Sequence, residues 1–384
     1  MDADAAKGDI MSAHMQASLY ESGIAAQPDG VVDQHYCYPG SLVLLPAGKL
    51  MAVFTAQCKA GPSRAVGIYS ADGGRTWSPP VTLFGGPELC DSSIDPGEAY
   101  GDPNLVIVND RRVMLFCVSL RHVRGALDLS RTRFWRRISE DGGETFGPVE
   151  ELPRHRRYYV GTVHAGMRLR NGALVMGYSW DMRAENHDPA DGEGAMDLVC
   201  GVLISRDEGL TWHPGGDLHA RVSRGAQALK HATNGLDEPA VVELANGDLF
   251  MLARTCDSKL WQSFSHDAGQ TWEPATPSAL VSHNCPATLL RLAGDDAVLV
   301  IYNNHPQQRV RLSASVSTDR CRTWPDPRLL APLDDPDQPE VSYPAACQLP
   351  DGTIVAVFGR IERSKPDAMF VIGCVRFSRT YLGT

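Results

Sequence analysis

Residues 265–272 read Ser265-His266-Asp267-Ala268-Gly269-Gln270-Thr271-Trp272, and this eight-residue turn pattern is repeated along the chain. Its form, Ser-x-Asp-x-Gly-x-Thr-Trp/Phe, occurs at residues 70–77, 139–146, 205–212, 265–272 and 317–324. In the fifth copy Cys321 stands where the other copies have glycine. Asp and Ser side chains can bond nearby backbone amides, and glycine supplies an unusual dihedral angle. Five copies at spacings of roughly 50–70 residues indicate a repeat architecture.

A second repeat lies between these turns. Each copy is an apolar strand, a polar or glycine turn and another apolar strand, and the strongest hairpin signal among them is an Asn-Gly turn. The six copies centre on Ala47-Gly48, Asn109-Asp110, Asn171-Gly172, Asn246-Gly247, Gly294-Asp295 and Asp351-Gly352. Two hairpins make a four-stranded blade, so the chain is predicted to be all-β, a six-bladed β-propeller of four-stranded antiparallel blades.

The predicted propeller covers residues 31–384. Residues 1–30 are polar, small and rich in Ala and Gly, and are assigned to an N-terminal extension. No eight-residue turn follows Gly352, so we expect an N-terminal strand to complete the sixth blade and close the ring. A helical fold is excluded because no long segment has a 3.6-residue period.

Composition and charge limit the kinds of partner and compartment expected for this chain. The chain has 384 residues and a formal net charge of -10, which argues against a nucleic-acid partner. No apolar run approaches the roughly 18 residues of a membrane span, and the first thirty residues lack a signal pattern. The ten cysteines form no CxxC pair, so neither a metal site nor a redox motif is expected. We expect a cytoplasmic protein with reduced cysteines; a secreted mature form stays open, and the oligomeric state is not predicted.

The starts of the six first strands indicate a site. Aligning the hairpins brings six residues into register, and in a propeller these begin the strands that line the axis. They are Tyr38, Asp102, His164, Glu238, Cys285 and Tyr343. Polar side chains are costly in a core unless a ligand or a network uses them. A ligand site is therefore predicted at this rim; a water-filled funnel is the alternative.

Arginines extend the pattern. Arg254 ends the second strand of blade four, and Arg360 is placed at nearly the same position in blade six. Arg309 precedes the fifth turn by about eight residues, which predicts the start of a third strand at the same rim. Guanidinium groups suit an anionic or polyhydroxylated ligand because they donate forked hydrogen bonds.

With these turns and this ring, the sequence resembles the sialidase superfamily of Asp-box (BNR-repeat) propellers over residues 31–384. The resemblance implies a carbohydrate substrate and no cofactor. It implies that Glu238 activates Tyr343 as a nucleophile, and that Arg254 and Arg309 grip a sugar carboxylate. Asp boxes are specific for the fold but not for the reaction.

Two departures from the family pattern concern the site. The family places its first arginine where this chain has Cys37, and its acid/base aspartate where this chain has residues 60–64, Ala-Gly-Pro-Ser-Arg. Arg64 or Arg360 could replace the arginine, with Tyr38 also facing the substrate. Asp102 or His164 could replace the proton donor.

Three functions are compatible with this pattern. The leading one is a sialidase-like exo-glycoside hydrolase that releases a terminal, acidic sugar with retention of the anomeric configuration. Exo-arabinanases share this propeller, so a neutral sugar as substrate is a close variant. The second is a polysaccharide lyase in which His164 and Tyr343 move protons and the arginines neutralise a uronate. The third is a non-catalytic sugar-binding propeller, which the two lost positions favour.

The loss of the arginine at Cys37 leads to a prediction. We expect the chain to cleave ordinary sialosides poorly, because the clamp on the sugar carboxylate is reduced to two arginines. The measurement is turnover of a fluorogenic sialoside. Rates on the order of 10 per second or more, typical of efficient enzymes, would mean that another arginine completes the clamp.

Overall fold

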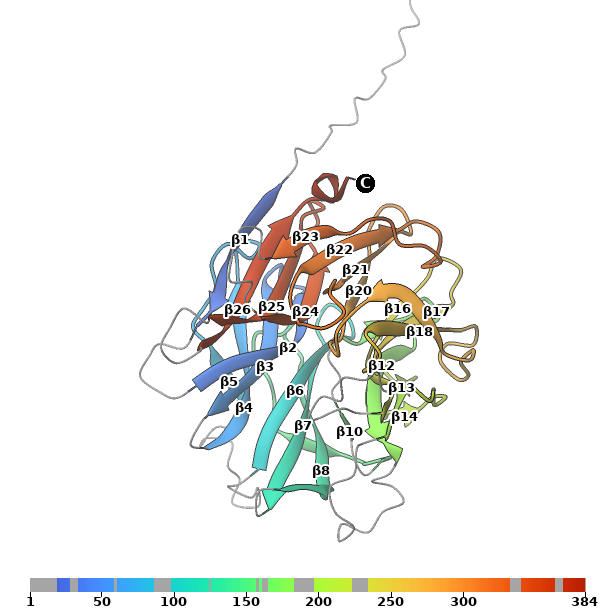
Figure 1. The fold of residues 1–384 in the computed structure, drawn as a ribbon. Coiled ribbons are helices and arrows are strands. Elements are labelled where there is room, and N and C mark those ends of the chain that lie inside the picture. The colour runs from blue at the N-terminus through green and yellow to red at the C-terminus, as the bar shows by residue number, and fades with distance from the viewer. Residues whose placement is uncertain are drawn as a thin grey trace, which may run out of the picture.

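The computed structural model describes most of the chain as antiparallel sheet. The described residues are 19–27, 34–58, 61–85, 98–123, 126–156, 159–160, 165–182, 197–222, 234–331, 340–362 and 369–383. They form six sheets arranged as the blades of a propeller (Figure 1), as predicted. Within these ranges no helix is both long and apolar enough to span a membrane.

The first three blades follow one another along the chain. Blade one consists of β2 (Gln34–Leu44), β3 (Leu50–Cys58), β4 (Gly61–Ser70) and β5 (Val81–Phe84). Blade two consists of β6 (Glu98–Ile107), β7 (Val113–Val123), β8 (Ala126–Ser139) and β9 (Glu150–Leu152). Blade three consists of β10 (Tyr159–Val160), β11 (Met167–Arg168), β12 (Leu174–Asp181), β13 (Asp197–Ser205), β14 (His213–Pro214) and β15 (Asn234–Gly235). Its innermost strand is in two pieces, since β10 and β11 both pair with β12.

The last three blades complete the ring. Blade four consists of β16 (Asp237–Glu243), β17 (Leu249–Arg254), β18 (Lys259–Ser265) and β19 (Thr276–Val281). Blade five consists of β20 (Thr288–Arg291), β21 (Val298–Asn303), β22 (Leu312–Ser317) and β23 (Arg328–Ala331). Blade six consists of β24 (Val341–Gln348), β25 (Ile354–Glu362), β26 (Met369–Phe377) and β1 (Tyr20–Ala26).

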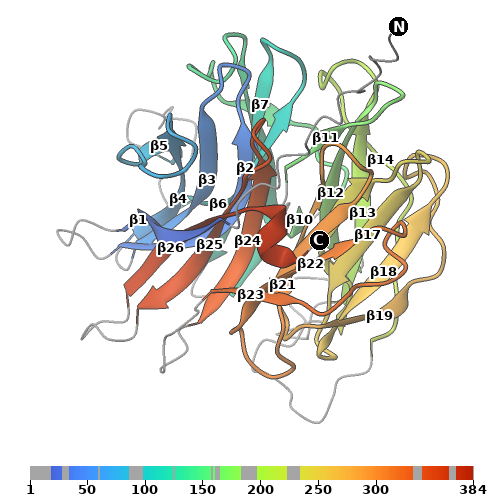
Figure 2. The same ribbon diagram turned by 90° about the horizontal axis from the view of Figure 1, so that it is seen from above.

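Closure of the ring depends on β1. This strand pairs antiparallel with β26, so blue and red ribbons lie side by side in Figure 1. Blades six and one then meet through β24 and β2, as Figure 2 shows from above. The predicted closure by an N-terminal strand is present. The propeller therefore begins before residue 31, because Tyr20–Ala26 lies inside the segment 1–30 that the sequence assigns to an N-terminal extension.

The eight-residue turns hold themselves together as their composition predicts. In the fourth copy, the Ser265 hydroxyl donates to Asp267 Oδ1 at 2.9 Å, and the Thr271 amide donates to the same oxygen at 2.8 Å. Gly269 has a φ of 88° there, a left-handed angle that favours glycine. Cys321 adopts a φ of 62° at the same place in the fifth copy, and its buried thiol packs in the core between blades four and five.

Strand register separates the turns from the predicted ring. In blade four Glu238 lies at the start of β16, while Ser265, the first residue of the Asp box, pairs with Leu249, which pairs with Glu243 at the end of β16. The box therefore lies at the opposite end of the sheet from Glu238, as predicted. The axis between the inner strands is hollow: a cavity of about 460 Å³ is lined by residues of β2, β11, β16, β20 and β24.

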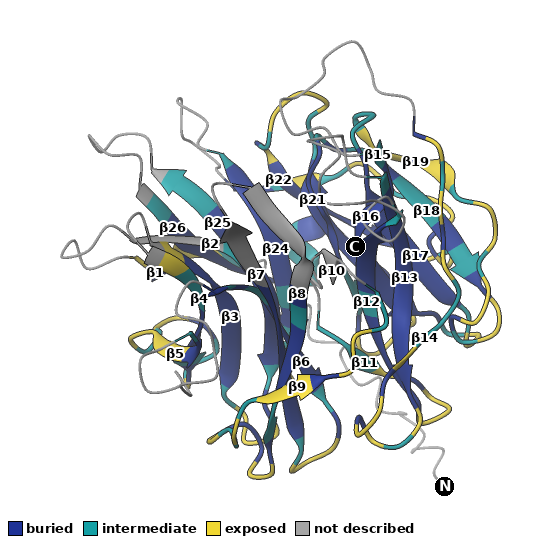
Figure 3. Ribbon diagram, turned by 90° about the horizontal axis from the view of Figure 1, so that it is seen from below, coloured by how far each residue is buried: buried dark blue, intermediate teal, exposed yellow. Residues whose placement is uncertain are grey.

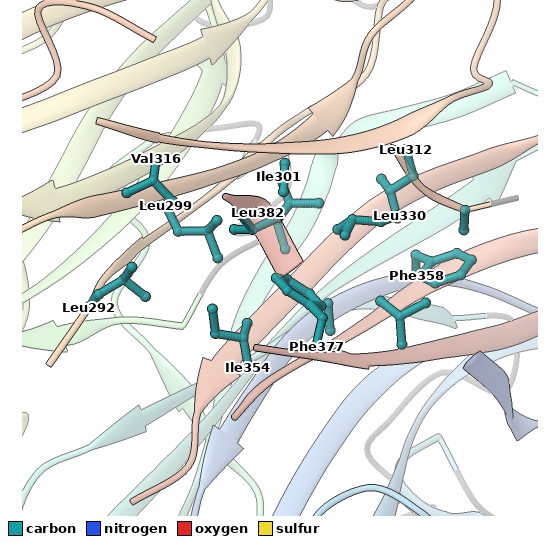
Figure 4. Close-up of a cluster of buried hydrophobic side chains, with 14 of the residues drawn as sticks. Leu292, Leu299, Ile301, Leu312, Val316, Leu330, Ile354, Phe358, Phe377 and Leu382 are labelled. Atoms are coloured by element: carbon teal, nitrogen blue, oxygen red, sulfur yellow. The ribbon is translucent and has the colours of Figure 1, made fainter. Parts of the chain in front are cut away.

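Hydrophobic side chains fill the spaces between blades. The strands are mostly buried and the turns exposed (Figure 3). Between blades five and six, Leu299 and Ile301 of β21 face Phe358 of β25 and Phe377 of β26 (Figure 4). Leu382 joins this cluster from the short 3-10 helix η2 (Arg379–Leu382).

The strand that closes the ring is anchored by Tyr20. Its ring stacks on Tyr381 at 4.9 Å and its hydroxyl donates to the Leu330 carbonyl. We expect Tyr20→Ala to lower the free energy of unfolding by about 2 kcal/mol, because an aromatic pair and a hydrogen bond are lost together. Urea unfolding measures this. Ser22→Ala, at an exposed position of the same strand, is the matched control and should change little; equal effects would contradict the anchor.

Candidate active site

The side chains at the predicted ring are aimed by an unusual backbone. Tyr38, Asp102, Glu238 and Tyr343 each precede a proline and have φ values of 51°, 51°, 42° and 54°. This left-handed conformation costs a residue with a Cβ roughly 1–2 kcal/mol. In each strand the pairing register shifts at this point. The proline has no N–H, so the interrupted ladder leaves no unpaired donor there.

Blade five departs from the predicted alignment. The left-handed residue there is Asn284, with a φ of 42°, and not the aligned Cys285. The sequence alignment put Cys285 in register because it precedes Pro286, but β20 begins only at Thr288. Asn is among the residues that tolerate this conformation best, which explains why it takes the kink. Cys285 remains fully buried beside the site.

Glu238 and Tyr343 meet across the axis. The Tyr343 hydroxyl donates to Glu238 Oε1 at 2.9 Å, and both side chains are buried. They come from β16 and β24, the inner strands of blades four and six, so the contact spans blade five. Arg254 joins the pair: its Nη1 donates to Glu238 Oε2 and, at 3.0 Å, to the Tyr343 oxygen. The contact expected from the sequence is present.

Asn284 ties two arginines to this pair. Its Oδ1 accepts from Arg254 Nε at 2.7 Å, and its backbone carbonyl accepts from an Arg309 Nη at 2.7 Å. The Arg309 guanidinium lies 5.6 Å from the centroid of the Tyr343 ring. The Arg309 carbonyl in turn accepts from the Val341 amide at 2.7 Å. Arg309 lies in the loop before β22, three residues short of the strand start that the sequence predicts.

The electrostatics keep Tyr343 a phenol at rest. Burial, and then the charge of Glu238, raise the pKa of Tyr343 well above its usual value, although Arg254 and Arg309 act in the opposite direction. Burial disfavours the charge on Arg254, but Glu238, Tyr343 and Asp237 together raise the pKa of this guanidinium. The proton of Tyr343 therefore points at a carboxylate, with a permanent positive charge beside the phenol oxygen.

Two further ring residues lie around this centre. The Tyr38 ring meets that of Tyr343 edge-on, with centroids 4.7 Å apart, so it forms part of the site wall as a half-buried aromatic. Asp102 holds the equivalent position in blade two, where its amide donates to Thr55 Oγ1 at 3.2 Å. After burial, the charge of Asp102 is the largest cause that raises the pKa of the Cys117 thiol, which lies behind it.

The two proposed substitute arginines lie differently from Arg254. In blade four Arg254 pairs with Asp237, the residue directly before the left-handed Glu238. In blade six the residue directly before the left-handed Tyr343 is Ser342, and it pairs with Gly359. Arg360 is one residue further, so its side chain leaves the opposite face of the strand. This corrects the near-equivalence expected from the sequence. Arg64 lies on β4, the third strand of blade one. Its Nε is buried and has no hydrogen-bond partner among the described residues.

Some predicted positions are outside the described residues. His164 is one of them, and the side chain of Cys37 is another. Among the residues that the structure describes, no three His, Cys, Asp or Glu side chains gather to hold a metal ion.

Sequence reasoning missed Asp237, Ser179 and Asn284. Asp237 precedes Glu238 and accepts from the Ser179 hydroxyl at 2.8 Å. Asp237 lies outside the aligned ring, and Ser179 comes from β12 in another blade, so strand alignment could not pair them. The signal for Asn284 was in the sequence, because Asn before Cys285 is the better candidate for a left-handed residue.

A closed six-bladed ring with a buried tyrosine, glutamate and arginine at one rim defines an Asp-box propeller with a polar axial site. Comparison with protein families assigns it further: the BNR repeat-like domain family matches residues 48–356, so the chain belongs to that family. A search of the curated proteins returns no match.

Solved structures share the fold. A protein of unknown function from Dyadobacter fermentans is 18% identical, with 93% of this chain and 98% of that chain covered and a TM-score of 0.72. The NanB sialidase from Streptococcus pneumoniae is 14% identical, with coverages of 94% and 71% and a TM-score of 0.69. The intramolecular trans-sialidase from Ruminococcus gnavus is 16% identical, with coverages of 91% and 96% and a TM-score of 0.65. At these identities the likeness shows the sialidase fold.

The bridging role of Asn284 can be tested by stability. Asn284→Gly keeps the left-handed backbone but leaves the buried Arg254 Nε without its acceptor. We expect the free energy of unfolding to fall by about 1–3 kcal/mol, the cost of an unsatisfied buried donor. Urea unfolding is the measurement. Asn304→Gly, at a half-buried position in the neighbouring loop, is the control for the entropy cost of glycine. An equal loss of unfolding free energy in both variants would refute the role of the Asn284 side chain.

Proposed function

We propose that this chain is a sialidase-like exo-glycoside hydrolase that releases a terminal, acidic sugar, with Tyr343 as nucleophile and Glu238 as its base. The observation that carries the proposal is the 2.9 Å hydrogen bond from the Tyr343 hydroxyl to Glu238 in a buried site. A nucleophile bonded to a base, with a third group orienting both, is the arrangement that covalent catalysis requires.

The first step moves one proton and forms one bond. The Tyr343 oxygen attacks the anomeric carbon while its proton passes to Glu238 Oε1. Arg254 donates to the oxygens of both residues, so its charge stabilises the phenolate character that develops during attack. A neutral phenol suits an acidic sugar better than a carboxylate nucleophile does, since the substrate carboxylate would repel a second anion.

The leaving oxygen needs a proton, and the glycosyl-tyrosine must then be hydrolysed. Asp102 or His164 gives its proton to the leaving oxygen and then takes one from the attacking water. As water displaces Tyr343, Glu238 returns the proton to the phenol oxygen. Two displacements at the anomeric carbon give net retention.

The arginines supply the preference for an anion. Arg309 is half-buried, and Asn284 takes only one of the five N–H donors that an arginine carries. Arg254 and Arg309 are both tied to Asn284, so two guanidinium groups stay at one rim without a substrate to hold them there. This preorganisation supports recognition of a sugar carboxylate by forked hydrogen bonds.

The test is a double-mutant cycle on Tyr343→Phe and Glu238→Gln, with a library of acidic glycosides as substrates. We expect each variant to lower kcat/KM on the order of 10³-fold, and the double variant to be little worse, because coupled catalytic residues act as a unit. Tyr302→Phe and Glu243→Gln are the matched controls, a buried tyrosine and the buried glutamate at the other end of β16. Both should keep full activity.

Losses that multiply in the double variant would contradict the pairing of nucleophile and base. Detection of a product with an unsaturated uronate would show that the reaction is an elimination and not a hydrolysis. Measurable sugar binding without turnover on any glycan would instead identify a binding propeller.

A further inference from the structure

A second buried carboxyl group lies beside the proposed base. Asp237 is 3% exposed and Glu238 5%, and both lie next to the guanidinium of Arg254. Arg254 Nη1 carries two hydrogens, which are donated to Glu238 and to Tyr343. Asp237 Oδ2 is 3.8 Å from the same nitrogen, beyond hydrogen-bond distance. Among the described residues nothing donates to this oxygen.

The other oxygen of Asp237 is well bonded. Oδ1 accepts from the Ser179 hydroxyl and from the Glu238 amide, each at 2.8 Å. The groups that face Asp237 are therefore Glu238 on its own strand, Arg254 on β17, Ser179 on β12 and the buried thiol of Cys200 on β13. The charge of Asp237 is the first cause after burial that raises the pKa of this thiol. Asp237 thus has one well-bonded oxygen and one oxygen to which no described residue donates.

Charge balance at the site calls for a proton. Two carboxylates and one guanidinium would leave an uncompensated negative charge in a buried place, which is costly. Arg309 adds a positive charge, but it lies over the Tyr343 ring and forms no ion pair with either carboxyl group among the described residues. Glu238 receives both direct donors and so carries the charge. Asp237 is the acid left to carry the proton.

From this geometry we propose that Asp237 is a positioning residue: it keeps a proton at the site, so that Glu238 is the single ionised acid beside Tyr343. The inference rests on the proposed function. When Asp237 loses its proton, a second negative charge stands beside the base, where it opposes both an acidic sugar and the developing phenolate. Catalysis should therefore fall on the alkaline side.

The ionisation of Asp237 agrees with this placement. Burial, and then the charge of Glu238, raise the pKa of Asp237 to about 7, against the opposing effects of Arg254 and the Ser179 hydrogen bond. The folded pKa is above the unfolded one, so the contribution of Asp237 to stability is present below about pH 4 and is lost as pH rises through about 7.

The first experiment compares pH profiles of kcat/KM for the wild type and Asp237→Asn. Asn keeps the Oδ1 acceptor for Ser179 and Glu238 but cannot ionise. We expect wild-type kcat/KM to fall about tenfold per pH unit above the pKa of Asp237, and the variant to lack this fall and to keep only the one that the proton donor sets. Asp257→Asn, near the same rim, should keep the wild-type profile. The same alkaline fall in Asp237→Asn would overturn the proposal.

The second experiment needs no activity. Urea unfolding at about pH 5.5 and about pH 8.5 should show Asp237→Asn gaining stability relative to the wild type at the higher pH, because only the wild type must then bury a second charge. A difference that does not change with pH would overturn the proposal. If the stability shift is present but no glycan is turned over, the proposed function fails while the buried proton stands.

A third variant covers a failure of Asp237→Asn to fold. Ser179→Ala removes a donor that favours the ionised form of Asp237, so the alkaline fall in activity should move to higher pH. An unmoved profile would count against Asp237 as the titrating group.

Discussion

The site depends on a backbone constraint at the start of the inner strands. A residue before proline takes a left-handed conformation in four blades, and Asn284 takes it in the fifth. In a regular strand successive side chains point to opposite faces of the sheet, which here means toward neighbouring blades. The kink instead brings Glu238 and Tyr343 together over the axis. Such strained residues persist only where the surrounding structure holds them in place, and they concentrate at functional sites.

The closed ring provides that support. Each blade buries both faces against its neighbours, and β1 pairs with β26 so that the outer side of β26 is not left unpaired. The self-bonded Asp boxes hold the far end of the sheets. The rim opposite is then free to carry polar side chains, and its rigidity sets the 2.9 Å contact between residues of blades four and six.

Compensation of charge explains why so many polar groups can be buried at this rim. Arg254 serves two oxygens, and Asn284 satisfies both Arg254 and Arg309. Removal of any member leaves a buried group unpaired, which is why the network acts as one unit. Asp237 is the exception, since it lies close to Arg254 without a hydrogen bond to it. The proton on Asp237 removes the second negative charge, which Arg254 does not compensate.

The sequence by itself determined the architecture and the centre of the site. Asp boxes and hairpin turns are local, because their bonds join residues within a few positions, so spacing alone predicted six blades. Proline marked the strand starts and brought Glu238 and Tyr343 into register. The residue type of Asn284 already favoured it over Cys285 at the kink of blade five. Only the tertiary structure decided that Arg360 leaves the other face of its strand, and that Asp237 faces Arg254 without a hydrogen bond to it. These outcomes depend on strand register at the kink and on side-chain distances between paired strands, which no local pattern encodes.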